Sequence, residues 1–217
     1  MRALFHPASA QGVTMSGDWF IFIVAACIVG AIVYALIFIP LILWRERPNR
    51  KAATFSGNPP LEIASTAISL IVVAALFVIT YTRENPVDAV SAHPESVVDV
   101  TAFRWSWQFD YPGSGIRTVG TPLMPPTLYL PIGRTTEIAL RTADVNHSFW
   151  VPAFLFKRDA IPGMTNRFDL KPNRLGTYPA RCAQFCGLDH AHMEFNVKVV
   201  PDIAFDRYIA SRGAATP

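Results

Sequence analysis

The stretch from Trp19 to Trp44 contains no charged residue, and this feature limits the possible folds more than any other. It is long enough to cross the hydrocarbon core of a bilayer as one helix, with a tryptophan at each expected water interface and Pro40 near its end. A second apolar stretch of spanning length follows at 61–82, with Glu62 in its first turn. The sequence therefore predicts that residues 1–86 form an N-terminal segment and a transmembrane helical hairpin.

The loop between the two stretches, Arg45–Lys51, is strongly basic. Because basic loops stay on the cytoplasmic side, we expect both termini on the periplasmic side of a prokaryotic inner membrane. Residues 1–18 have no apolar core of their own, so no separate cleavable signal is expected before the first helix. With 51% hydrophobic and 16% charged residues, the chain has the composition of a protein partly in the membrane, and a net charge of +3 does not indicate a nucleic acid partner.

Residues 87–217 change to short segments rich in β-branched and aromatic residues, broken by proline and glycine. Seven segments predict strands, at 97–111, 127–130, 135–140, 148–151, 166–170, 176–181 and 194–200. Their spacing is typical of a β-sandwich, and about 120 residues suffice for one core. A short helix is expected at 202–210. The predicted fold class is a membrane-anchored all-β protein, with a two-helix hairpin followed by a sandwich.

Two thiols, an imidazole and a thioether lie together in one short segment of this second domain. Cys182, Cys186, His190 and Met193 supply soft sulfur and borderline nitrogen, the ligands that favour copper over hard cations. A mononuclear blue-copper site uses one Cys, so a second Cys suggests two thiolates bridging two copper ions. A further imidazole must come from elsewhere, and His147 is the best candidate. A disulfide and a zinc loop are the alternatives, but neither requires Met193 or His147.

Three motifs together resemble those of a known family. They are the Cys-x3-Cys-Gly-x2-His-x2-Met loop, the segment Asp144–Gly163 and the aromatic run Trp105–Phe109. With the membrane hairpin they make the chain similar to subunit II of the haem-copper respiratory oxidases, of a divergent prokaryotic type. The resemblance implies a cupredoxin sandwich that carries the dinuclear copper centre CuA. Its implied ligands are His147, Cys182, the carbonyl of Gln184, Cys186, His190 and Met193, with His192 as the rival of His190.

The resemblance also implies a role in respiration. A CuA subunit accepts electrons from a periplasmic donor, cytochrome c or a similar protein, and passes them to a haem of subunit I, where oxygen is reduced to water and protons are pumped. Subunit III is a further expected partner. Trp105 is implied as the residue through which electrons enter, and period two places it on the same strand face as Trp107 and the aromatic residues that follow. Asp144 and Asp110 are candidates for donor docking.

The second membrane stretch and the copper loop depart from the family pattern at three positions. The resemblance places Glu62 at the mouth of a proton path into subunit I, but Ser65 stands where Trp is usual and Ser69 where Pro is usual. Gln184 replaces a Glu that binds an interfacial magnesium ion in many members. A neutral amide is a poor ligand for a hard cation, so we expect this magnesium to be absent or rebuilt.

Other functions remain open on the sequence alone. A copper-containing nitric oxide reductase could use the same anchor and domain, and the sequence of its catalytic subunit would separate the two. A membrane-tethered copper electron carrier is an alternative of another class, and it would purify without haem. A quinol oxidase subunit would not keep all the copper ligands, and nitrous oxide reductase would need a catalytic domain for which this chain has no room.

Overall fold

The computed structural model describes residues 2–45 and 57–213. The chain divides into two compact units, one formed by residues 17–84 and the other by residues 1–16 together with 85–217. The sequence-based division placed the first sixteen residues with the membrane part. In the structure they pack instead with the β-sandwich, for reasons given below.

Two long helices make up most of the first unit, α2 (Ala10–Leu43) and α3 (Pro59–Asp88). Both are long and apolar enough to cross a membrane. Compared with the predicted 19–44 and 61–82, α2 begins nine residues earlier and ends at Leu43, and α3 is longer at both ends. Near one end of the hairpin, the Arg83 guanidinium lies 3.1 Å from the Asp18 carboxylate and links the two helices. Most of the basic loop used to predict orientation lies outside the described residues.

Glu62 takes part in the N-terminal cap of α3. The side chain of Asn58 accepts a hydrogen bond from the Leu61 amide, and the Glu62 carboxylate accepts one from the Asn58 amide at 3.2 Å. Such reciprocal bonds satisfy amide groups that a helix start leaves without partners. The structure thus gives this acid a capping role, whatever further role it has.

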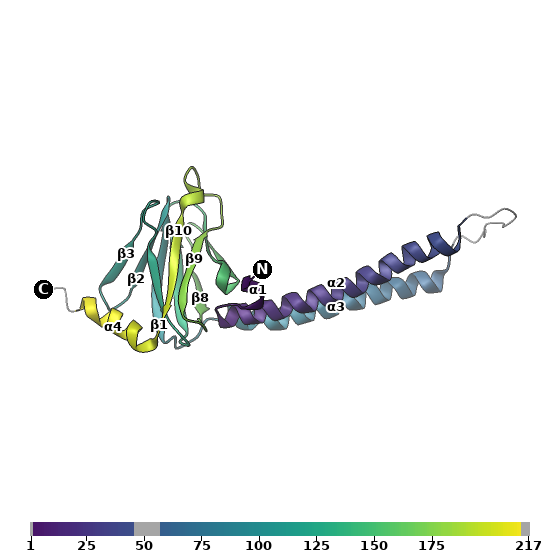
Figure 1. Ribbon diagram of the computed structural model, residues 1–217, viewed down its shortest axis with the longest axis horizontal. Coiled ribbons are helices and arrows are strands. Elements are labelled where there is room, and N and C mark those ends of the chain that lie inside the picture. The colour runs from purple at the N-terminus through teal and green to yellow at the C-terminus, as the bar shows by residue number, and fades with distance from the viewer. Residues whose placement is uncertain (1, 46–56, 214–217) are drawn as a thin grey trace. The chain divides into compact units, whose positions relative to one another are not determined.

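Ten strands form two five-stranded sheets in the second unit (Figure 1). The first sheet has the order β3-β2-β1-β5-β8, with strands Ile116–Val119, Ser106–Tyr111, Ser96–Phe103, Thr136–Thr142 and Asn166–Leu170. The second has the order β4-β10-β9-β6-β7, with strands Thr127–Pro131, Glu194–Val200, Gly176–Cys182, His147–Val151 and Phe156–Ala160. Strands β1 and β5 pair in parallel, as do β10 and β4, and the other pairs are antiparallel. This is the predicted sandwich.

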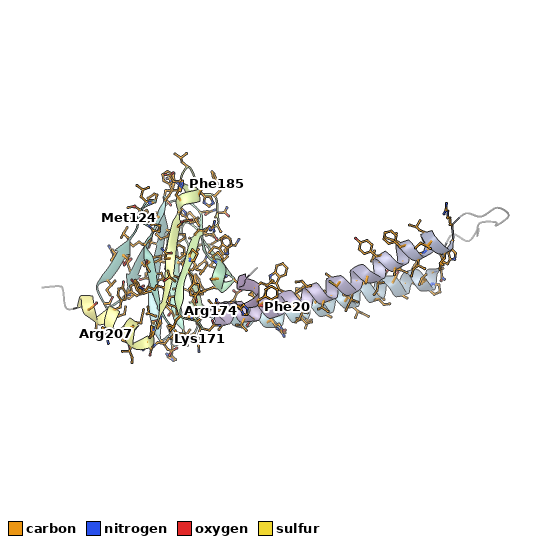
Figure 2. All side chains as sticks on the ribbon, in the orientation of Figure 1. Phe20, Met124, Lys171, Arg174, Phe185 and Arg207 are labelled. Carbon is orange, nitrogen blue, oxygen red and sulfur yellow. The ribbon has the colours of Figure 1, made fainter. Side chains whose placement is uncertain are left out.

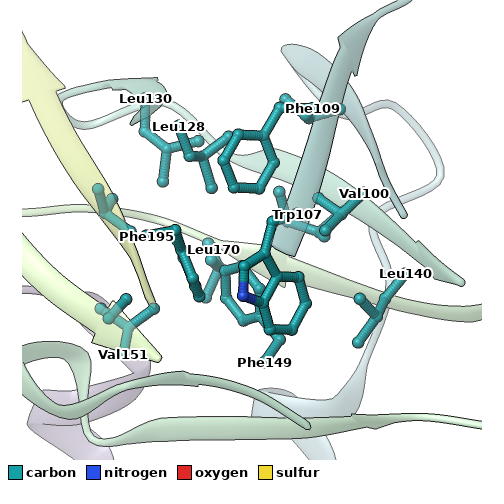
Figure 3. Packing of buried hydrophobic residues seen from close by; sticks show 14 of the residues in the cluster. Val100, Trp107, Phe109, Leu128, Leu130, Leu140, Phe149, Val151, Leu170 and Phe195 are labelled. Atoms are coloured by element: carbon teal, nitrogen blue, oxygen red, sulfur yellow. The ribbon is translucent and has the colours of Figure 1, made fainter. Parts of the chain in front are cut away.

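The core lies between the two sheets and is rich in aromatic side chains. Trp107 is fully buried at its centre, with the rings of Phe195 and Phe149 at centroid distances of 5.0 and 6.0 Å (Figure 3). Strand β1 shows why these residues fold this way, since its alternate residues Val98 and Val100 face the core. Truncating a buried aromatic such as Trp107 to alanine typically costs about 3–5 kcal/mol.

The prediction of a single strand at 97–111 is wrong, because the segment forms two strands. It is a hairpin of two antiparallel strands, β1 and β2, joined by a tight turn at Arg104 and Trp105. Trp105 therefore lies in the turn and is half-buried, whereas Trp107 and the alternate aromatic residues after it face the core. Strands β3 and β7 were not predicted. The C-terminal helix, α4 (Asp202–Gly213), covers one end of the sandwich, where the Tyr208 ring stacks on Tyr129 at 4.4 Å.

The N-terminal segment 6–12, here called the strap, is bound to the sandwich by backbone hydrogen bonds. It follows the short helix α1 (Arg2–Phe5) and contacts the turn η1 (Pro152–Phe154) and the chain after β8. The Ala8 amide donates to the Ala153 carbonyl at 2.8 Å, and the Ser9 hydroxyl donates to the Phe154 carbonyl at 3.0 Å. Ala8 and Ser9 are completely buried. The start of α2 is therefore part of the sandwich unit.

Candidate metal centre

The pairing of β6 with β9 brings the first two candidate ligands together. Cys182 ends β9 and lies opposite Phe149 of β6, and His147 is the first residue of β6. The Nδ1 atom of His147 is 3.8 Å from the Cys182 sulfur, and the two cysteine sulfurs are 4.0 Å apart. All three side chains are buried, and their ligand atoms lie within 4.8 Å of one another. This group of His147, Cys182 and Cys186 could hold a metal ion.

The loop between β9 and β10 supplies further ligand atoms on the Cys186 side. The Nδ1 atom of His190, the first residue of the short turn η2 (His190–His192), is 3.4 Å from the Cys186 sulfur. The sulfur of Met193, completely buried, is 3.7 Å from the same atom. The thiol pair thus has an imidazole at each end. The carbonyl of Gln184 lies 3.2 Å from the Cys182 sulfur, while the Gln184 residue itself is exposed.

His192 does not join this group. Its ring is exposed and lies 3.9 Å from the Asp189 carboxylate. Because η2 is a single turn, the side chains of His190 and His192 cannot both point towards the thiols. The structure therefore favours His190 over its rival.

Asp144 holds His147 in place rather than lying free on the surface. Its carboxylate is 2.9 Å from the Nε2 atom of His147 and accepts hydrogen bonds from the amides of Arg104 and Val145 at 2.8 and 2.7 Å. Partial burial disfavours the charged form, but these hydrogen bonds outweigh it and hold the pKa of Asp144 well below its usual range. Partners of this kind orient a ligand ring so that its other nitrogen faces the metal. This role of Asp144 was not predicted from the sequence, although its three-residue spacing to His147 is visible there.

The second docking candidate, Asp110, is also paired. Its carboxylate accepts hydrogen bonds from Arg117 and Gln108, both at 2.6 Å. The Arg117 contact crosses the β2–β3 pair, where Asp110 lies opposite Arg117, whereas Gln108 is on the same strand as Asp110. The Asp110 carboxylate is therefore engaged within the sheet.

The two thiols have different acidities in the absence of metal. Burial raises the pKa of Cys182, but hydrogen bonds from His147 and from nearby backbone outweigh it, so that the net shift is downward. Burial lowers the pKa of His147, and its contacts with Cys182 and Asp144 raise it overall. For Cys186, burial and the neighbouring Cys182 charge raise the pKa to about 12. A metal that binds both sulfurs as thiolates must therefore displace a proton from Cys186.

Trp105 contacts the loop that carries Cys186. Its indole Nε1 donates a hydrogen bond to the Cys186 carbonyl at 3.2 Å. The ring lies flat enough on the loop that a Cβ at Gly187 would come within 3.2 Å of it, and Gly187 also has a φ of +119°. Glycine is needed here on both counts. The half-buried indole therefore connects the surface to the thiol pair.

The donor set fits copper. Cys182 and Cys186 are free cysteines, and their 4.0 Å separation is about twice the length of a disulfide bond. Two thiols, two imidazoles and a thioether form a soft, buried ligand set, and the His147 ring already has the hydrogen-bond partner that fixes its orientation. Gln184 offers an exposed amide in place of a carboxylate, so this residue does not fit a magnesium ion.

Comparison with known proteins gives the family. Residues 124–200 match a family model described as "Cytochrome C oxidase subunit II, periplasmic domain". The "Probable cytochrome c oxidase subunit 2" of Streptomyces avermitilis is 35% identical, over 89% of this chain and 72% of the relative. The chain belongs to the cytochrome c oxidase subunit II family. The "Cytochrome c oxidase subunit 2" of Corynebacterium glutamicum is 30% identical, over 93% of this chain and 73% of the relative.

Solved structures show the same family at the level of the sandwich. The periplasmic domain of subunit II of cytochrome oxidase from Bradyrhizobium japonicum aligns with a TM-score of 0.52 and 25% identity, over 59% of this chain and all of that domain. A second structure is a mixed disulfide intermediate between a thioredoxin-like protein and subunit II, with a TM-score of 0.50 and 25% identity. The chain is thus a subunit II of cytochrome c oxidase, with two helices long and apolar enough to cross a membrane, a cupredoxin-like domain and a copper-site candidate.

Proposed function

We propose that this chain holds a dinuclear CuA centre and is the subunit through which electrons enter the oxidase. The observation that carries the proposal is the order of ligand atoms, with an imidazole at each end of a buried thiol pair. This order suits two metal ions, each bound by one imidazole and both thiolates. A single ion held by His147, Cys182 and Cys186, whose ligand atoms lie within 4.8 Å of one another, would leave the His190 imidazole unused.

Each residue has a defined part in this proposal. Cys182 and Cys186 would hold the copper ions through their thiolates, and His147 and His190 would each supply an imidazole. Met193 and the Gln184 carbonyl would be weaker ligands. When bound, two coppers that share one electron through two thiolates change their bond lengths little, which makes electron transfer fast. The protein keeps this site buried and holds the His147 ring through Asp144.

The family supports a role for the chain in respiration. We infer that a periplasmic donor, cytochrome c or a similar protein, delivers single electrons by way of Trp105, and that the haem of subunit I receives them. Oxygen reduction to water, coupled to proton pumping, takes place in subunit I, and subunit III completes the core of the complex. The sandwich then lies on the periplasmic side of the inner membrane. We keep Glu62 as the candidate mouth of the proton path, beside its capping role.

The thiols must be reduced before they can bind copper. In the relative that forms a mixed disulfide with a thioredoxin-like protein, subunit II undergoes thiol-disulfide exchange. We propose that a thioredoxin-like partner keeps Cys182 and Cys186 reduced in the same way here, because an oxidising compartment otherwise favours their disulfide.

Electron paramagnetic resonance of the copper-loaded chain tests the dinuclear centre. We expect one unpaired electron shared equally by two copper nuclei. Cys186→Ser should abolish this signal because it removes a bridge, whereas His192→Ala should leave it unchanged because His192 is exposed and outside the group. The spectrum of a single type 1 copper, or stoichiometric zinc without copper uptake, would contradict the proposal.

A further inference from the structure

A buried carboxylate lies at the end of the sandwich away from the candidate metal centre. Asp169 in β8 is only 7% exposed, and Figure 2 shows Lys171, two residues further along, at the end of the sandwich opposite Phe185. One oxygen of Asp169, Oδ2, accepts a hydrogen bond from the Ser91 amide at 2.8 Å. Among the described residues, no hydrogen-bond partner faces the other oxygen, Oδ1, which is shielded from solvent. Leaving such an oxygen without a partner is costly, so we expect it to bind one.

A second carboxylate faces Asp169 across the sheet. Glu137 of β5 lies opposite Asp169 in the antiparallel β5–β8 pair, so both side chains project from the same face, with Cβ atoms roughly 5 Å apart. The Glu137 side chain is only 11% exposed, and the Arg167 guanidinium on the same face of β8 binds its carboxylate. Two carboxylates against one guanidinium leave one negative charge in excess. That charge lies on Asp169.

The segment of residues 89–95, here called the junction segment, joins α3 to β1 and is fastened to the sandwich at this carboxylate. Its Ser91 amide donates to Asp169, and its Ser91 hydroxyl accepts a hydrogen bond from the His93 amide at 3.3 Å. His93 and Glu95 are the titratable side chains of the segment, and both are exposed. Neither provides a buried positive charge for Asp169.

The other neighbours of Asp169 do not neutralise it either. The neutral amide of Gln11 in α2 donates to the main-chain carbonyl of Asp169 at 3.0 Å. Lys171, just beyond β8, is exposed, and its backbone amide donates to the Gln11 side chain at 3.2 Å. A calcium ion takes six to eight oxygen ligands, more than two carboxylates supply. A proton needs no such shell, and it would give Oδ1 a hydrogen to donate.

We propose that Asp169 binds a proton from solvent on Oδ1, that the Glu137 carboxylate accepts the resulting hydrogen bond, and that this proton holds the junction segment closed against the sandwich. The proton returns to solvent when the segment opens, and Arg167 stays on Glu137 throughout. The inference does not depend on copper. It makes Asp169 a pH-sensitive clasp at the point where the chain leaves α3 and enters the sandwich.

The electrostatics of the site agree with this geometry. Burial raises the pKa of Asp169, the Ser91 hydrogen bond opposes the rise, and the facing Glu137 charge adds to it. In the open form the carboxyl group is solvated, and its pKa returns to about 3.9. The closed form is therefore fully favoured below the pKa of the open form, and this advantage is lost as the pH rises through the raised pKa of the closed form.

Infrared difference spectroscopy of the purified full chain in detergent detects the proton directly, because a protonated carboxyl group has a C=O stretch that a carboxylate lacks. At neutral pH we expect this band in the wild-type chain and its loss in Asp169→Asn. Glu137→Gln should also abolish it, because the facing charge is gone and Arg167 is free to pair with Asp169. Asp99→Asn is the matched control, since Asp99 lies in the same sheet and pairs with Arg141 at 3.4 Å, and it should keep the band.

Hydrogen exchange over the junction segment, followed by mass spectrometry and corrected for the intrinsic effect of pH, measures the closure. Protection in the wild-type chain should fall as the pH rises above about 4, by up to about tenfold per pH unit, because each opening releases one proton. Asp169→Asn should keep protection high at every pH, since its side-chain amide donates to Glu137 as the protonated acid does. Asp99→Asn should follow the wild-type curve.

Three outcomes would overturn the inference. Absence of the carboxyl band at neutral pH would show that Asp169 is ionised. Loss of protection at every pH in Asp169→Asn would show that the negative charge, and not a proton, holds the Ser91 amide. Protection that rises with added sodium or calcium, but not with choline at the same ionic strength, would assign the buried oxygen to a metal cation.

Discussion

Trp105 is a single residue that lies between the protein surface and the candidate metal centre. Its indole is half-buried, and its hydrogen bond reaches the backbone of Cys186. We expect Trp105→Ala to slow electron transfer from the donor by at least tenfold, because it opens a gap in the path. Trp105→Phe keeps a ring over Gly187 but loses the hydrogen bond, worth about 1 kcal/mol, and should be intermediate. Stopped-flow reduction of the oxidase by its donor measures both.

The copper content of the same variants tells the two roles of Trp105 apart. Because the indole donates its hydrogen bond to the backbone carbonyl of Cys186 and not to the sulfur, copper content and haem spectra should stay near wild type. Loss of copper from Trp105→Phe would contradict a relay role and would assign Trp105 to the support of the loop.

Asp169 is a second residue with a testable consequence, far from the copper end. It is 93% buried by residue area, one of its oxygens lacks a hydrogen-bond partner, and the other accepts from the Ser91 amide at 2.8 Å. Burial raises its pKa, the Ser91 bond opposes this, and the facing Glu137 adds to it. A raised folded-state pKa means that stability falls as the pH rises above the unfolded pKa of the carboxyl group.

Asp169→Asn should therefore stabilise the chain at pH 7. Removing a buried charge with an unsatisfied oxygen should raise the free energy of unfolding by about 1 kcal/mol, which raises the melting temperature by about 2–4 °C. The gain should shrink as the pH falls through the raised folded-state pKa of Asp169 and should be gone at about pH 4, where the unfolded carboxyl becomes protonated as well. Circular dichroism melts from pH 4 to pH 8 measure it, and a gain independent of pH would show that charge is not the cause. Glu137 and its partner Arg167 must be unchanged in this comparison.

At the scale of elements, the strand pattern of the sequence was informative wherever polar and apolar residues alternate between clear turn residues. The turn at Arg104 and Trp105 has neither Gly, Pro nor Asn, so two strands were predicted as one. Strand β7 has an apolar residue only at each end, so its sequence does not show the alternation that predicts a strand. It is a strand because it pairs with β6. Tertiary pairing decides such segments.

No sequence pattern predicted the strap, and its packing against η1 leads to a testable prediction about stability. A Cβ at Gly12 would lie 2.5 Å from the Phe154 carbonyl oxygen and 2.8 Å from Pro7. Gly12→Ala should therefore destabilise the sandwich by about 1–2 kcal/mol, since the strain of overpacking exceeds the better helix propensity of alanine. The thermal unfolding midpoint of the full chain in detergent measures this effect.

Gly30 provides the matched control within the same helix. A Cβ there meets nothing within 4 Å, so Gly30→Ala should be neutral or slightly stabilising. If the two substitutions had equal effects on melting, the close packing of Gly12 against η1 would not be important for stability.

At the scale of the whole molecule, the two-part plan was readable from hydropathy alone, whereas the site needed both sequence and fold. Five of the six candidate ligands lie between Cys182 and Met193, so their spacing was enough to bring them together. His147 reaches them through the β6–β9 pairing, which was expected by resemblance and not derivable from spacing. Asp144 is only three residues from His147, but the Arg104 amide that helps to hold its carboxylate lies far from it in sequence. The contacts of the strap with η1 also join segments far apart in sequence, and no local sequence pattern predicts them.

The division into two units predicts how the excised sandwich behaves. A chain of residues 85–217 contains every proposed ligand and should bind two copper ions, but it lacks the strap. The surface around η1 that Ala8 and Ser9 cover would then be open. A peptide of residues 4–16, added at about 100 times its dissociation constant, should stabilise the excised domain by about 2.7 kcal/mol, because it binds the folded state alone.

The same peptide with Gly12→Ala is the control and should have little effect, because its Cβ would meet the Phe154 carbonyl. Differential scanning fluorimetry at several peptide concentrations measures the shift, and the copper resonance shows whether the site is affected. A melting temperature that does not respond to either peptide would mean that the strap is held in place by its connection to α2 and contributes no binding energy of its own. A copper resonance that changes with the peptide would instead connect the strap to the metal centre, through η1 and the β6 strand that precedes it.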